Sequence, residues 1–162
     1  MSLDVNRLAH ALLRSLLASC WLFSPALLAD APAIQSSGFS TALHDARLVS
    51  WHNLIDNSTY DDERVQLERV NQFINRAVSF VSDQQAWGTE DYWATPAQTL
   101  SLGQGDCEDF AIAKYFSLVR MGIPSEKLRL TFVKALKLQQ AHMVLAFYPS
   151  ASEQPLILDN LD

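Results

Sequence analysis

Several features that define other classes of protein are missing from this 162-residue sequence. It has only two cysteines and five glycines, no internal repeat, no low-complexity tract and no block of consecutive Lys or Arg residues. Two cysteines exclude a disulfide framework. A composition that is 49% hydrophobic and 19% charged excludes a disordered chain, a collagen-like repeat and a coiled coil. The formal net charge of −6 argues against a nucleic-acid partner, and the length fits a single domain with a substantial core.

The start of the chain has the pattern of an export signal. Two arginines precede an apolar stretch, and Ala29, Ala31 and Ala33 have the spacing that a signal peptidase requires. We therefore expect residues 1–33 to be a signal peptide that is removed on export and residues 34–162 to form the mature domain. An uncleaved anchor or a buried helix is the alternative interpretation of the same hydropathy.

The placement of the two cysteines adds to this prediction. Cys20 lies inside the apolar stretch, in a sequence similar to a lipoprotein processing box, so lipidation there is a further alternative. If the signal is removed, Cys107 remains as the one cysteine of an exported protein. An unpaired cysteine in an oxidising compartment indicates a reactive thiol.

Hydrophobic periodicity predicts helices in the first part of the mature chain and strands in the last part. Thr95, Pro96 and Gln98 predict a further helix start with a capping box. The longer helices are expected over 40–55, 61–82 and 107–121, and the strands over 128–133, 142–148 and 155–159. This order predicts an α+β domain with an antiparallel sheet.

Cys107 is placed where a thiol can react. It opens the most apolar predicted helix, whose free N–H groups and dipole stabilise a thiolate and could hold an oxyanion. By itself, a single helical cysteine is more often a small core residue.

His142 and Asp159 fit a base and an orienting acid. If His142 lies opposite Asp159 in a hairpin, Tyr148 faces Glu153 across a four-residue loop, and the His and Asp side chains share one face. Together with Cys107, they predict a Cys-His-Asp triad, although each residue alone has an ordinary structural explanation.

Carboxylates surround the thiol in the segment Asp106-Cys107-Glu108-Asp109. Like charges of this kind raise a thiol pKa, and a hard cation such as calcium would remove the conflict. From composition alone, the simpler explanation is that the acids complement the helix N-terminus.

The chain resembles the bacterial transglutaminase-like cysteine proteinases, the LapG-type periplasmic proteases. The resemblance covers most of residues 51–162. Its motifs are Trp87-Gly88, Asp91 to Pro96, Gly105 to Asp109, Lys127 to Leu130, Ala141 to Leu145 and Leu158 to Leu161.

The resemblance implies a papain/transglutaminase-like fold in which a buried helix carries the cysteine and an antiparallel sheet carries the histidine and aspartate. Cys107, His142 and Asp159 match the family's triad, and Asp106 and Glu108 match positions tied to its calcium. The resemblance also implies cleavage of a large surface adhesin at a di-alanine site, with release of biofilm cells. The implied partner is the periplasmic domain of an inner-membrane cyclic-di-GMP receptor, and no nucleic acid is expected.

Two departures from the family pattern are visible. Gln98 stands where the family often has a carboxylate, a change that preserves the capping box. Family members also continue beyond the Leu-Asp-Asn-Leu segment, so we expect either a fragment or a shortened member whose Asp159 is weakly held. Two other functions stay open: another acyl-transfer enzyme of this fold, such as a transglutaminase or amidase, and a non-catalytic binding protein.

Overall fold

The computed structural model describes residues 36–161, so the predicted signal peptide at 1–33 and Cys20 lie outside the described residues. Within the described part, no helix combines the length and the apolar character needed to cross a membrane. The helices are α2 (Ser36–Ser58), α3 (Glu63–Ala77), α4 (Asp83–Ala86), α5 (Pro96–Leu102), α6 (Cys107–Arg120) and the 3₁₀ turn η2 (Ser125–Lys127). The strands are β1 (Ser79–Phe80), β2 (Gln104–Gly105), β3 (Leu128–Ala135), β4 (Gln140–Phe147) and β5 (Leu156–Leu158).

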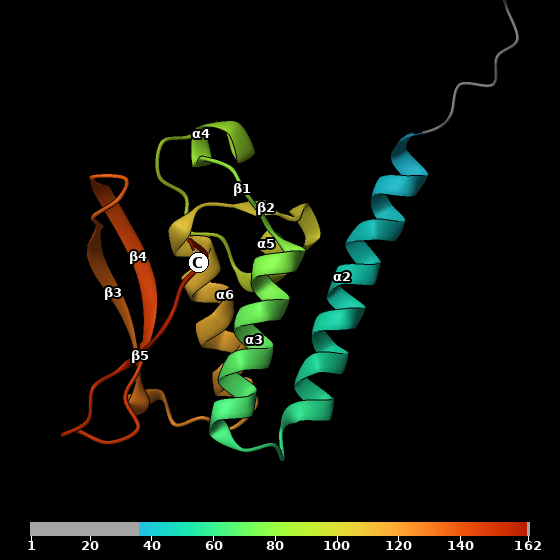
Figure 1. The fold of residues 1–162 in the computed structure, drawn as a ribbon. Helices are drawn as coiled ribbons and strands as arrows, with labels where there is room; N and C mark the ends of the chain where they lie inside the picture. Colours follow the sequence, from blue (N-terminus) through green and yellow to red (C-terminus); the bar gives the residue numbers. More distant parts are fainter. Residues whose placement is uncertain (1–35, 162) are drawn as a thin grey trace, which may run out of the picture. The chain divides into compact units, whose positions relative to one another are not determined.

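Helix α6 is the centre of the domain. On one side it packs against the antiparallel sheet β3-β4-β5, and on its other sides it packs against α3 and α5, with α2 lying against these two helices (Figure 1). The Trp51 indole N–H donates to Ser117 Oγ at 2.7 Å and so ties α2 to α6. The predicted α+β domain with an antiparallel sheet is confirmed.

The central position of α6 agrees with its predicted burial, but one large apolar side chain of the helix faces solvent. Phe110, Ala113 and Leu118 are at most 3% exposed, whereas Phe116 is 48% exposed. Because α6 contacts the sheet and α3 at once, two faces of the helix are buried and the remaining one turns Phe116 to solvent. Gly122, at φ 97°, follows the end of the helix, where a left-handed conformation favours glycine.

The predicted helix over 61–82 is five residues too long at its C-terminal end. It ends at Ala77, because the chain then pairs with β2 as a short parallel ladder, with Ser79 N–H bonded to Gly103 O and Val81 N–H bonded to Gly105 O, both at 2.9 Å. This ladder positions the loop that leads into Cys107. The predicted capping box of Thr95 and Gln98 is present at the start of α5.

Candidate active site

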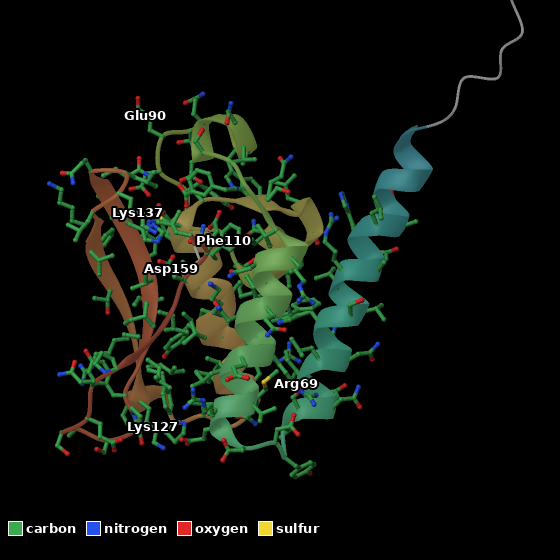
Figure 2. All side chains as sticks on the ribbon, viewed as in Figure 1. Arg69, Glu90, Phe110, Lys127, Lys137 and Asp159 are labelled. Atoms are coloured by element: carbon green, nitrogen blue, oxygen red, sulfur yellow. The ribbon has the colours of Figure 1, made fainter. Side chains whose placement is uncertain are left out.

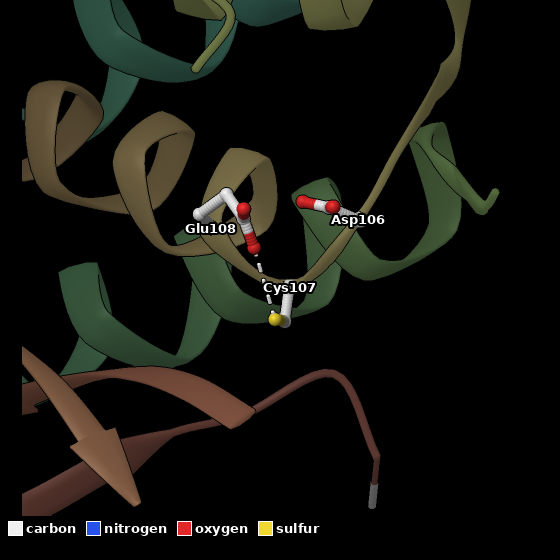
Figure 3. A group of neighbouring side chains, drawn as sticks. All are labelled: Asp106, Cys107 and Glu108. Carbon is white, nitrogen blue, oxygen red and sulfur yellow. Dashed lines mark hydrogen bonds between the residues drawn. The ribbon is translucent and has the colours of Figure 1, made fainter. Parts of the chain in front are cut away.

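Cys107 is the first residue of α6, as predicted, and it is half-buried. Asp106 precedes the helix but makes no side-chain capping bond. The Cys107 thiol donates to Glu108 Oε2 at 3.1 Å. In Figure 3 the thiol points toward the strands, while the Asp106 carboxylate lies on the opposite side of the chain. The thiol therefore stands between the sheet and a group of acids.

The surroundings of Cys107 favour the neutral thiol. Burial raises its pKa to about 12, and the hydrogen bond to Glu108 and the charges of Glu108 and Asp106 act in the same direction. The backbone N–H of Met143, in β4, acts in the opposite direction and lowers the Cys107 pKa, because it stabilises a negative sulfur. This amide also places the sulfur against β4 one residue away from His142.

His142 and Asp159 form a hydrogen-bonded pair. His142 Nε2 lies 2.7 Å from Asp159 Oδ1, with the histidine side chain 3% exposed and the aspartate side chain 25% exposed. Burial alone would raise the pKa of Asp159, but hydrogen bonds from His142 and from the backbone N–H groups of Leu161 and Asn160 hold it below its usual value. The carboxylate is thus ionised at neutral pH and can fix the orientation and tautomer of the imidazole.

The register of β4 and β5 from which we predicted this pair is wrong. Leu145 pairs with Leu158, so the ladder places Asp159 level with Val144 rather than with His142. The connecting segment is eight residues, 148–155, rather than four, because it contains a turn closed by Ser150 Oγ donating to Glu153 Oε1 at 2.7 Å. His142 and Asp159 meet as diagonal neighbours on the same face of the sheet.

Asn75 holds Asp159 from the other side of the domain. Its side-chain N–H donates to the Asp159 backbone carbonyl at 2.7 Å, across 84 residues of sequence. Asp159 lies three residues before the end of the given sequence, yet its carboxylate and its carbonyl are both bonded. Sequence reasoning missed Asn75, because a polar residue on a helix carries no signal of so distant a contact.

A group of acids lies on the side of Cys107 away from the sheet. Carboxylate oxygens of Asp83, Asp106 and Asp109 approach within 4.8 Å of one another, and Asp83, Asp91 and Glu108 form an overlapping group. Burial raises the pKa of Asp106 to about 8, helped by a hydrogen bond and charge from Glu108 and by the charges of Asp83 and Asp109. Burial also raises the pKa of Asp109, to about 6, so both of these carboxyl groups are held here at the expense of their charged forms.

The oxygens of this cluster suit a hard cation. One buried oxygen on each of Asp83, Asp106 and Asp109 has no hydrogen-bond partner. Backbone N–H groups hold the second oxygen of two of these carboxylates. The N–H of Tyr92 donates to Asp83 at 2.5 Å, and the N–H of Ala94 donates to Asp109 at 2.9 Å. Unpartnered buried carboxylate oxygens facing one another are the ligand set that calcium prefers, so the residues present fit that ion.

Of the predicted metal residues, Asp106 and Glu108 both lie in these groups, and together they also flank Cys107 in a third. The sequence analysis did not place Asp83 or Asp91 in this cluster. It included Asp109 in the carboxylate segment that a hard cation would suit, but not among the residues that match the family's calcium positions. Asp83 carried no such signal, since the β1–β2 ladder brings its segment beside α6.

Gly105 shows how closely this cluster is packed. A Cβ at this position would lie 2.7 Å from Asp109 Oδ2 and 2.8 Å from Asp109 Cβ. Only glycine leaves room for the Asp109 side chain where the loop enters α6.

The fold and this arrangement define a papain/transglutaminase-like thiol site, and comparison with known proteins gives the family. Residues 48–162 match the family of bacterial transglutaminase-like cysteine proteinases, and the chain belongs to that family. Among solved structures it is similar to Legionella pneumophila LapG, with 42% identity and a TM-score of 0.66 over 77% of this chain and 72% of that one. Among curated protein sequences there is no significant match.

Two further LapG structures bear on the acid cluster. The calcium-bound form has 43% identity and a TM-score of 0.68, over 78% of this chain and 71% of that one. The EGTA-treated form has 42% identity and a TM-score of 0.66, over 77% and 70%. The relative is thus described both with calcium and after treatment with a chelator.

Proposed function

We propose that this protein is a calcium-dependent cysteine endopeptidase in which Cys107 is the nucleophile, His142 the general base and Asp159 the orienting acid. The observation that carries the proposal is the 2.7 Å hydrogen bond between His142 and Asp159. Met143, the residue after His142 on β4, directs its backbone N–H at the Cys107 sulfur. Family membership supports the reaction class, and calcium in the related LapG structure supports the ion.

The chemistry follows from the orientation of these groups. His142 Nε2 is bonded to Asp159, which leaves Nδ1 to accept the Cys107 proton. The sulfur then attacks a peptide carbonyl, and His142 returns the proton to the departing amine. Water, deprotonated by the same imidazole, hydrolyses the acyl-enzyme. Free N–H groups in the first turn of α6 are placed to stabilise the oxyanion.

The acid cluster would make this reaction depend on calcium. We assign Asp83, Asp91, Asp106, Glu108 and Asp109 as the residues that would hold the ion. When bound there, calcium supplies positive charge that offsets the carboxylates beside the thiol. Glu108 would then be drawn toward the ion, and the thiol would lose the acceptor that holds its proton.

The biological setting is proposed on the resemblance alone. We propose that the substrate is a large surface adhesin cut near its N-terminus, so that cleavage releases biofilm cells. The protein would act in the periplasm after export, and the periplasmic domain of a cyclic-di-GMP receptor would sequester it.

The proposal is tested with the purified chain and an adhesin N-terminal segment that contains a di-alanine sequence. Cleavage is followed by mass spectrometry in calcium and in EGTA, with Cys107→Ser as the matched control. We expect cleavage in calcium only, and none by the variant. Cleavage that persists in Cys107→Ser would overturn the nucleophile assignment, and equal cleavage in EGTA would overturn the calcium dependence.

A further inference from the structure

The turn between β3 and β4 exposes aliphatic side chains close to the active site. Leu136 is 75% exposed and Leu138 is 53% exposed. Turn positions favour Gly, Asn, Asp and Pro, so two large aliphatic residues at the tip of a hairpin are unusual there. A contiguous exposed apolar surface on a globular domain often marks a binding site. The mechanism above gives this turn no role.

These leucines line a pocket that reaches the triad. The pocket has a volume of about 370 Å³, and its lining residues are Ala135, Leu136, Lys137, Leu138, Asp159 and Leu161. Apart from the lysine and the aspartate, these residues are apolar. Figure 2 labels Lys137 on the turn and Asp159 on the segment that follows β5. One wall of the pocket is therefore the hairpin turn, and another is the segment that carries the orienting acid.

The register of β3 and β4 relates this pocket to the histidine. Ala135 pairs with Gln140 at the end of the ladder that the turn closes. Directly opposed residues project to one face of a sheet, and so do residues two apart along a strand. The side chains of Ala135, Gln140 and His142 are therefore on the same face. An occupant of the pocket would lie on the face of the sheet that carries the proposed base.

The chemistry of peptide cleavage indicates which part of a substrate this pocket would receive. The acyl half of the substrate becomes bonded to Cys107 Sγ, at the start of α6. The other half begins with the departing amine, whose nitrogen must come within hydrogen-bond reach of the His142 imidazole. Asp159 is bonded to that imidazole and also lines the pocket. A short extended segment after the departing amine is thus long enough to reach the pocket.

We propose that Leu136 and Leu138 are specificity-determining residues: with Leu161 they form an apolar subsite for a large aliphatic or aromatic side chain of the substrate. That side chain belongs to one of the first three residues after the cleaved bond. The inference rests on the proposed function and adds to it the class of residue preferred on that side. Apolar substrate area would be buried against the leucines, whereas a polar side chain there would lose hydration without gaining a partner.

The test compares peptides built on the adhesin segment of the cleavage assay, with either Leu or Ser at each of the three positions after the cleaved bond in turn. Mass spectrometry in calcium gives kcat/KM for each peptide. We expect the wild-type protein to prefer Leu over Ser by about 10-fold at one position, as is typical of a few methylene groups in an apolar pocket. The double variant Leu136→Asn, Leu138→Asn should lose most of that preference, while asparagine remains suited to a turn.

Leu43→Asn is the matched control. Leu43 is a leucine of α2 that is 42% exposed and does not line the pocket, so this variant should keep the wild-type preference. An unchanged preference in the double variant would overturn the inference even where both rates fall, because the turn would then support the fold rather than select a side chain.

Two results for the wild-type protein separate this inference from the proposed function. Cleavage of all the peptides without a preference would overturn the inference and leave the proposed function standing. Cleavage of none of them in calcium would overturn the proposed function, and the inference would fail with it.

Discussion

The two sides of Cys107 differ in how completely the chain satisfies its own polar groups. Toward the sheet, His142 and Asp159 are bonded to each other, and Asp159 is held again by Asn75 and by two backbone N–H groups. Away from the sheet, three buried carboxylate oxygens have no partner, and the pKa of Asp106 is raised to about 8. The first side is satisfied by groups of the chain itself, whereas the second side leaves buried oxygens that a cation would satisfy.

Under the proposed mechanism, this difference predicts a thiol that stays unreactive until a cation is bound. His142 and Asp159 are already bonded to each other, so the acid cluster accounts for what remains unfavourable to the thiolate after burial itself. Of the groups that raise the Cys107 pKa, Glu108 and Asp106 both belong to that cluster. A cation bound to these acids would therefore offset the charge that they place beside the thiol.

Disrupting the sheet side should have the largest effect. His142→Gln keeps the size of the side chain and removes the base, so we expect the cleavage rate to fall by about 10³-fold or more. Calcium should still raise the thermal midpoint of this variant, because the acid cluster is intact. Loss of the calcium response together with activity would show that the two sides are not separate.

Disrupting the acid side should give the reverse result. Asp106→Asn removes one ligand charge without removing a helix cap, since Asp106 makes no side-chain capping bond. We expect calcium affinity to fall about 10- to 100-fold, by calorimetry, with the His142–Asp159 pair intact. Glu90→Gln is the control, because Glu90 is an exposed acid of the neighbouring loop outside these groups. Equal affinity losses in the two variants would contradict the assignment.

The pH dependence of stability should separate the two sides in the calcium-free protein. The folded pKa of Asp106 is raised from 3.8 to about 8, so the folded state binds the extra proton across that range and stability falls as pH rises through it. Asp159 has a lowered pKa, so its contribution is lost only as pH falls below 3.8. Thermal midpoints between pH 4 and 8 should decline in EGTA, and they should decline less steeply in Asp106→Asn, where Asp109, with its pKa raised to about 6, keeps part of the slope. An unchanged slope in that variant would contradict this origin.

The smallest effect is expected for Asn75→Ala. Removing one part-buried hydrogen bond costs about 1 kcal/mol of unfolding free energy, and a less firmly held Asp159 should lower the cleavage rate only a few-fold. Chemical denaturation and initial rates measure both. Gln72, exposed on the same helix, gives a matched Ala control; a rate loss equal to that of Asp159→Asn would mean that Asn75 does more than hold the backbone.

Local patterns in the sequence predicted what local physics determines. The start of α6 at Cys107, the capping box at Thr95 and the three strands follow from residues adjacent in the chain. The hairpin register was missed by two residues, because hydrophobic alternation is unchanged by a shift of two and only the turn at Ser150 decides the loop length. Asp83 was missed as a ligand because its placement depends on pairing between β1 and β2, which are distant in sequence.

The hydrogen bond from Asn75 to Asp159 also bears on when the site can be completed during synthesis of the chain. The ribosome adds Asp159 52 residues after Cys107, and this late residue must dock on a helix made long before. A nascent chain can therefore form α6 with its thiol while His142 still lacks its bond to Asp159. Under the proposed mechanism, reactivity would then begin only once this last contact has formed.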